Sequence, residues 1–176
     1  MLTLTLLRHA KSSWDEPLDD YDRPLALRGM KAAPEMGGAL DAMGLTPDVV
    51  ICSGAVRARE TLQLVLDRLG GTAPHVVYDD SVYMATPATL MKRLRAIEQE
   101  SEVIAPRHVM LVGHNPGLEV LALELCGSGD SDGRKRMAQK FPTAAAAVIT
   151  FDAKGWGEIK PGGGRLKYFI TPKQVA

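Results

Sequence analysis

Short apolar runs recur along this chain and predict the strands of a sheet. They are rich in Leu, Val and Ile and are bounded by polar or glycine-containing segments, as buried strands are. The runs span residues 2–7, 48–52, 75–78 and 109–112. Two further β-rich segments, 144–151 and 165–170, are separated by a turn-rich stretch and are expected to form a terminal antiparallel pair.

Between these runs, apolar residues recur at the three-to-four-residue spacing of amphipathic helices. The helical segments span residues 29–43, 56–69, 88–101 and 118–126. Gly44 and Gly70 stand where the first two helices should end, and Thr86-Pro87 offers a cap and a first-turn proline to the third. Pro34 lies inside the first segment, so that helix either starts just before the proline or bends there.

Strands thus alternate with helices through most of the chain, which is typical of a three-layer α/β/α fold. The 176 residues suit one hydrophobic core, and we expect a single domain spanning residues 1–176. Two polar stretches, 10–27 and 127–136, are predicted to be surface loops. The first is long for a compact domain, and loops of that length are usually functional.

Composition and charge narrow the classes of function. Lys plus Arg and Asp plus Glu each number 21, so the formal net charge is zero and no global field attracts nucleic acid or an anionic membrane. No apolar stretch approaches the roughly 20 residues of a membrane span, and Arg8 interrupts the first apolar run too early for a signal peptide. With only two cysteines, Cys52 and Cys126, in apolar surroundings, the sequence predicts a cytoplasmic protein without disulfides. The oligomeric state stays open.

Basic residues follow three of the predicted strands. Arg8-His9-Ala10 comes directly after the first strand, Arg57 shortly after the second, and His114 after the run at 109–112. Because ligands bind at the carboxyl ends of the strands in open α/β sheets, we expect these side chains to converge. Two Arg and two His in one place are typical of a site that handles phosphate.

Each residue type has a chemical role in such a site. The planar guanidinium forks of Arg8 and Arg57 match phosphate oxygens, and a neutral imidazole is a competent nucleophile for phosphorus. His9 is the better nucleophile candidate, because the neighbouring cations favour its neutral form, whereas His114 would donate to the phosphoryl oxygens. Taken alone, His114 could be an ordinary turn residue and Arg57 a solvated helix charge. The prediction rests on their coincidence at three strand ends.

The combined motifs resemble the histidine phosphatase (phosphoglycerate mutase-like) superfamily. They are Leu7-Arg8-His9-Ala10, Ser53-Gly54-Ala55-Val56-Arg57-Ala58-Arg59-Glu60-Thr61 and Val112-Gly113-His114-Asn115-Pro116. Within the superfamily, the chain is similar in its small size to the SixA-type phosphohistidine phosphatases. The same likeness extends to Arg23-Pro24-Leu25 leading to Gly29, and to Val82-Tyr83 with Pro87.

The resemblance implies a phosphoglycerate mutase-like fold and a role for each site residue. His9 would be the phosphorylated nucleophile, Arg8 and Arg57 would bind the phosphate, and His114 would contact it from the other side. Ser53 would belong to the rim of the same pocket. The family works without a metal or organic cofactor, and no His, Cys or Asp set in this sequence has metal-ligand spacing.

One position departs from the superfamily pattern. Met84 stands where many members carry a glutamic acid, and a methionine cannot protonate an alkoxide leaving group. This favours a phosphoramidate such as phosphohistidine, whose imidazole leaving group is protonated more readily. A proton could instead come from a loop carboxyl, the candidates being Asp79, Asp80, Asp20 and Asp22.

The favoured hypothesis is therefore a metal-independent phosphatase that acts through phosphorylated His9 on phosphohistidine in a protein. One alternative keeps the chemistry but acts on a small phosphate ester. Another is a phosphate- or phosphoprotein-binding module with vestigial catalysis, although all four core residues are present. The charge run Arg134-Lys135-Arg136 is interpreted as a solvated face, with docking of an acidic partner as the second interpretation.

Overall fold

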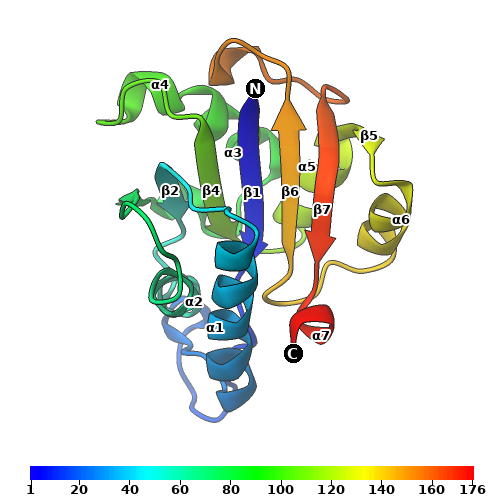
Figure 1. Ribbon diagram of the computed structural model, residues 1–176. Coiled ribbons are helices and arrows are strands. Elements are labelled where there is room, and N and C mark those ends of the chain that lie inside the picture. The colour runs from blue at the N-terminus through cyan, green and yellow to red at the C-terminus, as the bar shows by residue number, and fades with distance from the viewer.

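A seven-stranded sheet forms the centre of the computed structural model, which describes all residues 1–176 (Figure 1). The strands run in the spatial order β3-β2-β4-β1-β6-β7-β5. The three strands β2, β3 and β4 are parallel to β1, whereas β6 is antiparallel to both β1 and β7. Their bounds are β1 Leu2–Arg8, β2 Val49–Cys52, β3 His75–Tyr78, β4 His108–Gly113, β5 Cys126–Gly129, β6 Ala146–Phe151 and β7 Gly164–Ile170. The four predicted strands and the terminal antiparallel pair are confirmed.

Six helices and three short 3-10 turns connect the strands, and a seventh helix follows the last strand. Thr86 caps α3 by accepting from the backbone N–H of Thr89 at 3.2 Å, and Pro87 is its first residue, as predicted. Gly44, at a φ of 69°, follows the end of α1. The bounds are α1 Leu27–Ala42, α2 Val56–Leu66, α3 Pro87–Arg95, α4 Ile97–Glu100, α5 Gly117–Leu125, α6 Ser131–Gln139, α7 Pro172–Val175, η1 Asp20–Asp22, η2 Asp80–Val82 and η3 Trp156–Glu158.

The sheet has a hydrophobic core on each face, because successive side chains of a strand point to opposite sides. In β1, Leu4 and Leu6 join one core and Leu7 joins the other. Helices α1 and α2 contribute Met36 and Leu62 to the core around Leu7, and α3 and α5 pack on the opposite face (Figure 1). The three-layer α/β/α prediction is therefore confirmed.

The segment 127–136 is not the surface loop that its polarity predicts. Its first residues belong to β5, which pairs with β7, and the rest form α6. The strand has no apolar pattern because its glycines lie against neighbouring backbone: a Cβ at Gly127 would collide with the carbonyl of Gly162. Helix α6 buries only Gly133 and Met137, so helical spacing is nearly absent from its sequence.

Three helix boundaries also differ from the prediction. Helix α1 starts at Leu27, before Pro34, and continues through the proline. Helix α2 ends at Leu66, three residues earlier than expected. The predicted helix 88–101 divides at Ala96 into α3 and α4.

Both cysteines are free thiols. Burial raises the pKa of Cys52 to about 12 and that of Cys126 to about 11. At neutral pH neither side chain has the thiolate character of a reactive cysteine.

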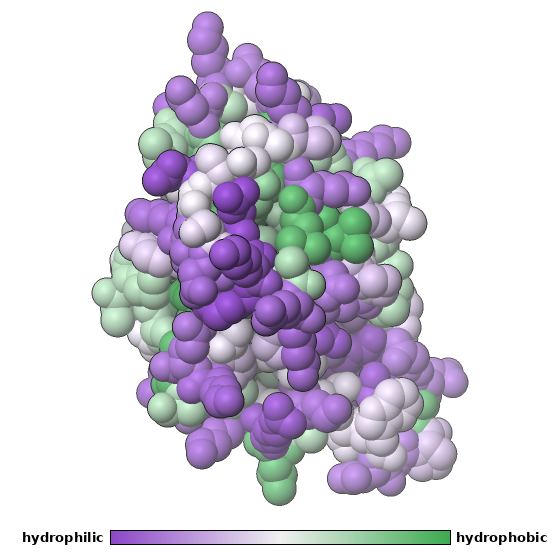
Figure 2. Space-filling view, turned by 90° about the vertical axis from the view of Figure 1, so that its right-hand side faces the viewer, coloured by the Kyte–Doolittle hydropathy of each residue, from purple (hydrophilic) through white to green (hydrophobic).

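No helix combines the length and apolar character needed to cross a membrane. The surface seen from the side of α6 and the edge strand β5 is largely hydrophilic, with a small hydrophobic patch near its centre (Figure 2). The carboxyl ends of β1, β2 and β4 meet at one edge of the sheet, and the start of antiparallel β6 lies there too.

Candidate active site

A cavity of about 290 Å³ lies at that edge of the sheet and brings together Arg8, His9, Arg57 and His114. Arg8 ends β1, and the register pairs it with Gly113, the last residue of β4, so His9 and His114 follow adjacent strand ends. Arg57 comes from the first turn of α2, after β2. The other lining residues are Lys11, Ser12, Trp14, Asp20, Arg23, Met84, Asn115 and Thr143.

His9 is held as a neutral imidazole in a single tautomer. Its Nδ1 lies 2.7 Å from the carbonyl oxygen of Ala10, which can only accept, so Nδ1 carries the proton. The lone pair is then on Nε2, which accepts a hydrogen bond from Nε–H of Arg57 at 3.4 Å. Burial, with the nearby Arg57, Arg8 and Arg23 charges, lowers the pKa of His9 to about 4. Burial contributes more to this shift than the cations that the sequence suggested.

Arg57 is buried, with 2% of its surface exposed, although its place on an amphipathic helix was compatible with a solvated charge. Its guanidinium spans the cavity between the two histidines, with Nη2 at 3.3 Å from Nδ1 of His114. The same group donates to Asp20, through Nη1 to the backbone oxygen at 2.5 Å and through Nη2 to the carboxylate at 2.9 Å.

His114 lies beside His9, with the ring centroids 5.1 Å apart. Since Arg57 can only donate, Nδ1 of His114 accepts, and its Nε2–H donates to Oγ of Ser53 at 2.7 Å. Burial, followed by the neighbouring His9 and Arg57, lowers the pKa of His114 to about 3. His114 is therefore neutral in the free site, and becomes a donor toward the cavity only if it gains a proton.

Ser53 does not lie on the pocket rim, where the resemblance put it. It is fully buried behind His114, and its Oγ also accepts from the backbone N–H of Ala55 at 3.2 Å. Its position explains the orientation of His114, since a buried imidazole needs a partner for its N–H.

Arg8 is fixed through the segment that leads into β6. Its Nη1 donates to the carbonyl of Phe141 at 3.0 Å, and Asn115 donates to the same oxygen at 3.0 Å. The Nε of Arg8 is buried and has no partner. Because buried donors are nearly always paired, this N–H is a donor available to an anion in the cavity.

Asp20 is the lining residue whose contacts the sequence could not foresee. Its carboxylate accepts from the hydroxyl of Tyr83 at 2.5 Å, from Arg57 and from Arg23. The Tyr83 hydrogen bond, with those from Arg57 and Arg23, lowers the pKa of Asp20 to about 2. Asp20 is one of the four carboxyl groups that the sequence offers as a proton donor. Its place in a polar loop is the only feature of the sequence that indicates a role in the site.

The other three candidate acids do not line the cavity. Asp79 pairs with Arg93, and Asp80 accepts from the hydroxyl of Tyr21 at 2.6 Å. Met84 does line the cavity, at a φ of 48° and half-exposed, where the resemblance places an acid in other family members.

Trp14 was not anticipated as a site residue. It is 72% exposed, and one ring face lies over the guanidinium of Arg23 at 3.5 Å. An exposed aromatic residue in an otherwise polar loop was the available signal.

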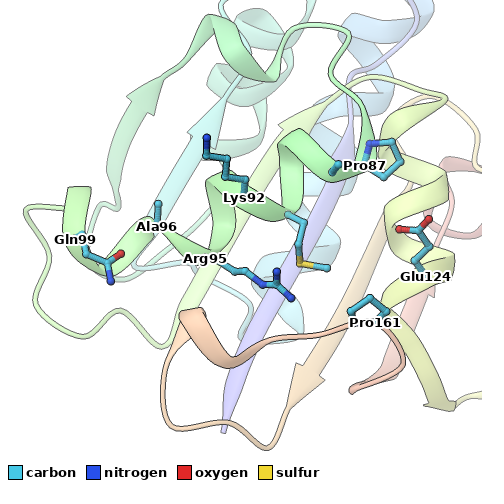
Figure 3. A pocket seen from close by; sticks show the side chains of 9 residues that line it. Pro87, Lys92, Arg95, Ala96, Gln99, Glu124 and Pro161 are labelled. Carbon is cyan, nitrogen blue, oxygen red and sulfur yellow. The ribbon is translucent and has the colours of Figure 1, made fainter.

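No group of three or more His, Cys, Asp and Glu side chains is arranged to hold a metal ion. A larger cavity of about 740 Å³ is lined mainly by α3, with Glu124 and Pro161 facing it (Figure 3). It shares no residue with the histidine cluster, and its Arg95 is bound to the carbonyl of Ile159. The candidate chemistry is therefore confined to the smaller cavity.

Comparison with known proteins agrees with this architecture. The family model of the histidine phosphatase superfamily (branch 1) matches residues 4–82. An uncharacterized protein of Mycobacterium tuberculosis is 34% identical over 169 residues, which cover 95% of this chain and 100% of the relative. An uncharacterized protein of Mycobacterium leprae is 36% identical over 172 residues, with 95% and 100% coverage. The chain belongs to the histidine phosphatase superfamily.

Solved structures place it near one branch of that family. A protein from Agrobacterium tumefaciens, provisionally described as the phosphohistidine phosphatase SixA, is 29% identical, with a TM-score of 0.78 over 97% of this chain and 98% of its own. A protein of the same provisional description from Nakamurella multipartitia is 26% identical, with a TM-score of 0.81 over 97% and 96%. The chain is thus SixA-like, and its family supports phosphatase activity on a phosphorylated substrate.

Proposed function

We propose that this protein is a phosphohistidine phosphatase that acts through phosphorylated His9 and removes the phosphoryl group from histidine in another protein. The observation that carries the proposal is the hydrogen bond from Nδ1 of His9 to the Ala10 carbonyl, which leaves the Nε2 lone pair beside Arg57. A neutral imidazole fixed in this tautomer is ready to attack phosphorus.

In the first step, Nε2 of His9 forms a bond to phosphorus while the bond from phosphorus to the substrate nitrogen breaks. Arg8 and Arg57 hold the phosphoryl oxygens as negative charge spreads over them in the transition state. The unpartnered Nε of Arg8 supports this role. The dianion also raises the proton affinity of His114, so that Nδ1 can take up a proton and donate to a third oxygen.

In the second step, water attacks phosphorus and the bond to Nε2 of His9 breaks. Inorganic phosphate leaves, and His9 returns to its neutral form. The hydrogen bond to Ala10 keeps Nδ1 protonated throughout, so the bond breaks to give the same tautomer.

The proton donors that the cavity lacks favour a phosphoramidate as the substrate. Asp20 is the one carboxyl that lines it, and its pKa of about 2 makes it a carboxylate at neutral pH. An alkoxide leaving group would therefore lack a carboxylic acid as its proton donor. Phosphohistidine protonated on its second ring nitrogen releases neutral imidazole, and therefore needs no acid from the protein.

The size of the cavity supports a protein substrate. About 290 Å³ is at the lower limit of pockets that enclose a whole small molecule, and it suits a phosphorylated side chain inserted from a larger surface. The exposed ring of Trp14 at the margin of the cavity would then contact the incoming side chain or its surroundings.

The mechanism is tested by incubating the protein with phosphoramidate as phosphoryl donor. The protein is then denatured, and the stability of its phosphoryl group is measured in acid and in base. The wild-type protein should form a base-stable, acid-labile phosphoenzyme on His9. His9→Ala should abolish it and reduce turnover by at least about 10³-fold, because it removes the imidazole to which the phosphoryl group is transferred. His75→Ala, outside the site, is the matched control. Full turnover by His9→Ala would overturn the mechanism.

The substrate class is tested separately, by comparing kcat/KM on a phosphohistidine peptide with a panel of sugar phosphates and nucleotides. The proposal expects the peptide to be preferred by at least about 10²-fold, the contribution typical of a missing acid catalyst. Equal or faster turnover of an ester would assign the protein to small phosphate esters instead.

A further inference from the structure

A second cavity, of about 590 Å³, adjoins the active site and is lined by basic residues. Its cations are Arg28 at the start of α1, Arg136 on α6, Lys140 just after α6 and Lys173 on α7. No Asp or Glu lines it. We call this surface, defined by these four residues, the basic groove.

The basic groove is continuous with the candidate active site. Thr143 lines both cavities, and it belongs to the segment whose Phe141 carbonyl holds Arg8. Figure 1 shows α7 and the connection into β6 at the end of the sheet where β1 ends. A ligand whose phosphoryl group reaches His9 can therefore extend along the basic groove.

Three of the four cations are free to bind a partner. Arg28, Lys140 and Lys173 are exposed and form no ion pair within the protein. Arg136 is already engaged, with Asp132 at 3.2 Å and with the carbonyl of Phe169 at 3.2 Å. The net charge of the chain is zero, so this local excess of positive charge is a property of the groove and not of the whole molecule.

The loop that borders the rest of the active site is rich in negative charge, although exposed Lys11 also lines the cavity. The segment that contributes Trp14 and Asp20 also carries exposed carboxylates, namely Asp15, Glu16, Asp19 and Asp22. An acidic partner would be repelled from that segment and attracted to the basic groove, which fixes one direction of approach.

We propose that the basic groove docks an acidic segment of the phosphoprotein substrate, next to the phosphohistidine that enters the active site. The proposal rests on the function proposed above. The three free cations are long side chains from separate parts of the chain, and the guanidinium of Arg136 is already paired. These cations therefore suit carboxylates spread along a polypeptide better than one compact phosphate. This places Arg136 within the docking surface as an already paired cation, and leaves Arg134 and Lys135 outside it.

The test uses three substrates with the full-length protein: phosphoramidate, a peptide with phosphohistidine between glutamates, and the same peptide with glutamines. The groove variant Arg28→Glu/Lys140→Glu/Lys173→Glu is compared with Lys92→Glu/Lys154→Glu/Lys160→Glu. The control has the same change in net charge. Its residues lie on α3 and in the β6–β7 connection, at the opposite end of β6 from the site.

The wild-type protein and the control variant should prefer the glutamate peptide by about tenfold or more in kcat/KM, and added salt should weaken the preference. The groove variant should lose the preference while keeping its turnover of phosphoramidate. An equal rate on both peptides in the wild type, or a preference retained by the groove variant, would overturn the proposal.

Binding of the peptide can also be measured without catalysis. The readout is the fluorescence anisotropy of a labelled, unphosphorylated glutamate peptide. Binding to the wild type but not to the groove variant supports the docking surface. Equal binding to both argues against it. Failure of the proposed function would instead appear as no turnover of either peptide.

Discussion

Arg57 and Asp20 form an ion pair inside the candidate active site, with Nη2 of the arginine 2.9 Å from the carboxylate. The arginine is almost wholly buried, whereas the Asp20 side chain is about half-exposed. A phosphoryl group that binds Arg57 must therefore compete with, or approach alongside, a negative charge that already occupies one face of the guanidinium.

The first prediction concerns this competition. Asp20→Asn should strengthen competitive inhibition by inorganic phosphate about tenfold, because it removes a like charge a few ångströms from the bound anion. Inhibition constants measured at fixed ionic strength check this. Asp22→Asn, an exposed neighbour outside the cavity, should leave the constant unchanged. Weaker inhibition of Asp20→Asn would mean that Asp20 positions Arg57 more than it opposes the phosphate.

The second prediction concerns the guanidinium fork of Arg57. Arg57→Lys keeps the positive charge but loses the simultaneous contacts to both histidines, and should lower kcat by about 10²–10³-fold. Arg59→Lys, on the exposed side of the same helix, is the control and should stay near wild-type. A lysine variant with full activity would show that charge alone suffices.

The third prediction concerns the tautomer of His114. Ser53→Ala removes the acceptor of the Nε2–H, so the buried imidazole loses its orientation and kcat should fall about tenfold. The ¹⁵N shifts of the ring nitrogens should show a protonated Nε2 in the wild type and a mixed state in the variant. An unchanged tautomer in Ser53→Ala would remove the positioning role from Ser53.

The fourth prediction concerns stability and pH. Burial lowers the pKa of His9 to about 4 and that of His114 to about 3, so both stay neutral in the folded state where the unfolded chain, near 6.5, takes up protons. The unfolded state therefore binds more protons, and the free energy of unfolding should fall as pH decreases from above 6.5 toward 4. Asp20, with its pKa at about 2, adds a further loss below its usual value of 3.8.

Urea unfolding at pH 7.5 and pH 5 measures this slope. His9→Gln/His114→Gln should flatten it, although half-buried His108, whose pKa is also lowered, keeps part of it. His75→Gln, outside the site, is the control for the loss of a histidine. A slope that the double variant does not change would show that the two site histidines are not the source.

Local signals in the sequence predicted most of the sheet and the four central site residues. Strands such as β1 and β4 are short apolar runs in which neighbouring residues pack into the two cores on opposite faces of the sheet. This apolar pattern can be recognised without knowing which strands lie beside them. Arg8, His9 and His114 follow those runs directly, and the rule that parallel strands end at one edge brings them together.

The features that sequence could not predict depend on contacts between distant parts of the chain. β5 is a strand because its backbone meets β7 some 38 positions away, as in the pair Cys126 and Gly164, and not because of an apolar pattern. Asp20 reaches Arg57 only through the path of a polar loop. Ser53 could be assigned to the site but not to its buried side, because that depends on where the ring of His114 lies.

The last prediction concerns Met84 and the choice of substrate. Its side chain lines the active-site cavity, and its backbone is already in the left-handed region at a φ of 48°, so Met84→Glu adds a carboxyl group without imposing a new type of backbone strain. A glutamic acid there can protonate an alkoxide leaving group, and general acid catalysis contributes about 10²–10⁴-fold. Met84→Glu should therefore gain activity on alkyl phosphates while changing little on phosphohistidine.

Met84→Gln is the matched control, since it has the same shape and polarity as the glutamic acid but no transferable proton. The ratio of ester to phosphohistidine turnover, measured for the three proteins as a function of pH, should rise only for Met84→Glu and should fall again as the new carboxyl ionises. A gain shared by Met84→Gln would attribute the effect to polarity or access. No gain in either variant would mean that the absence of an acid at this position does not determine the substrate class.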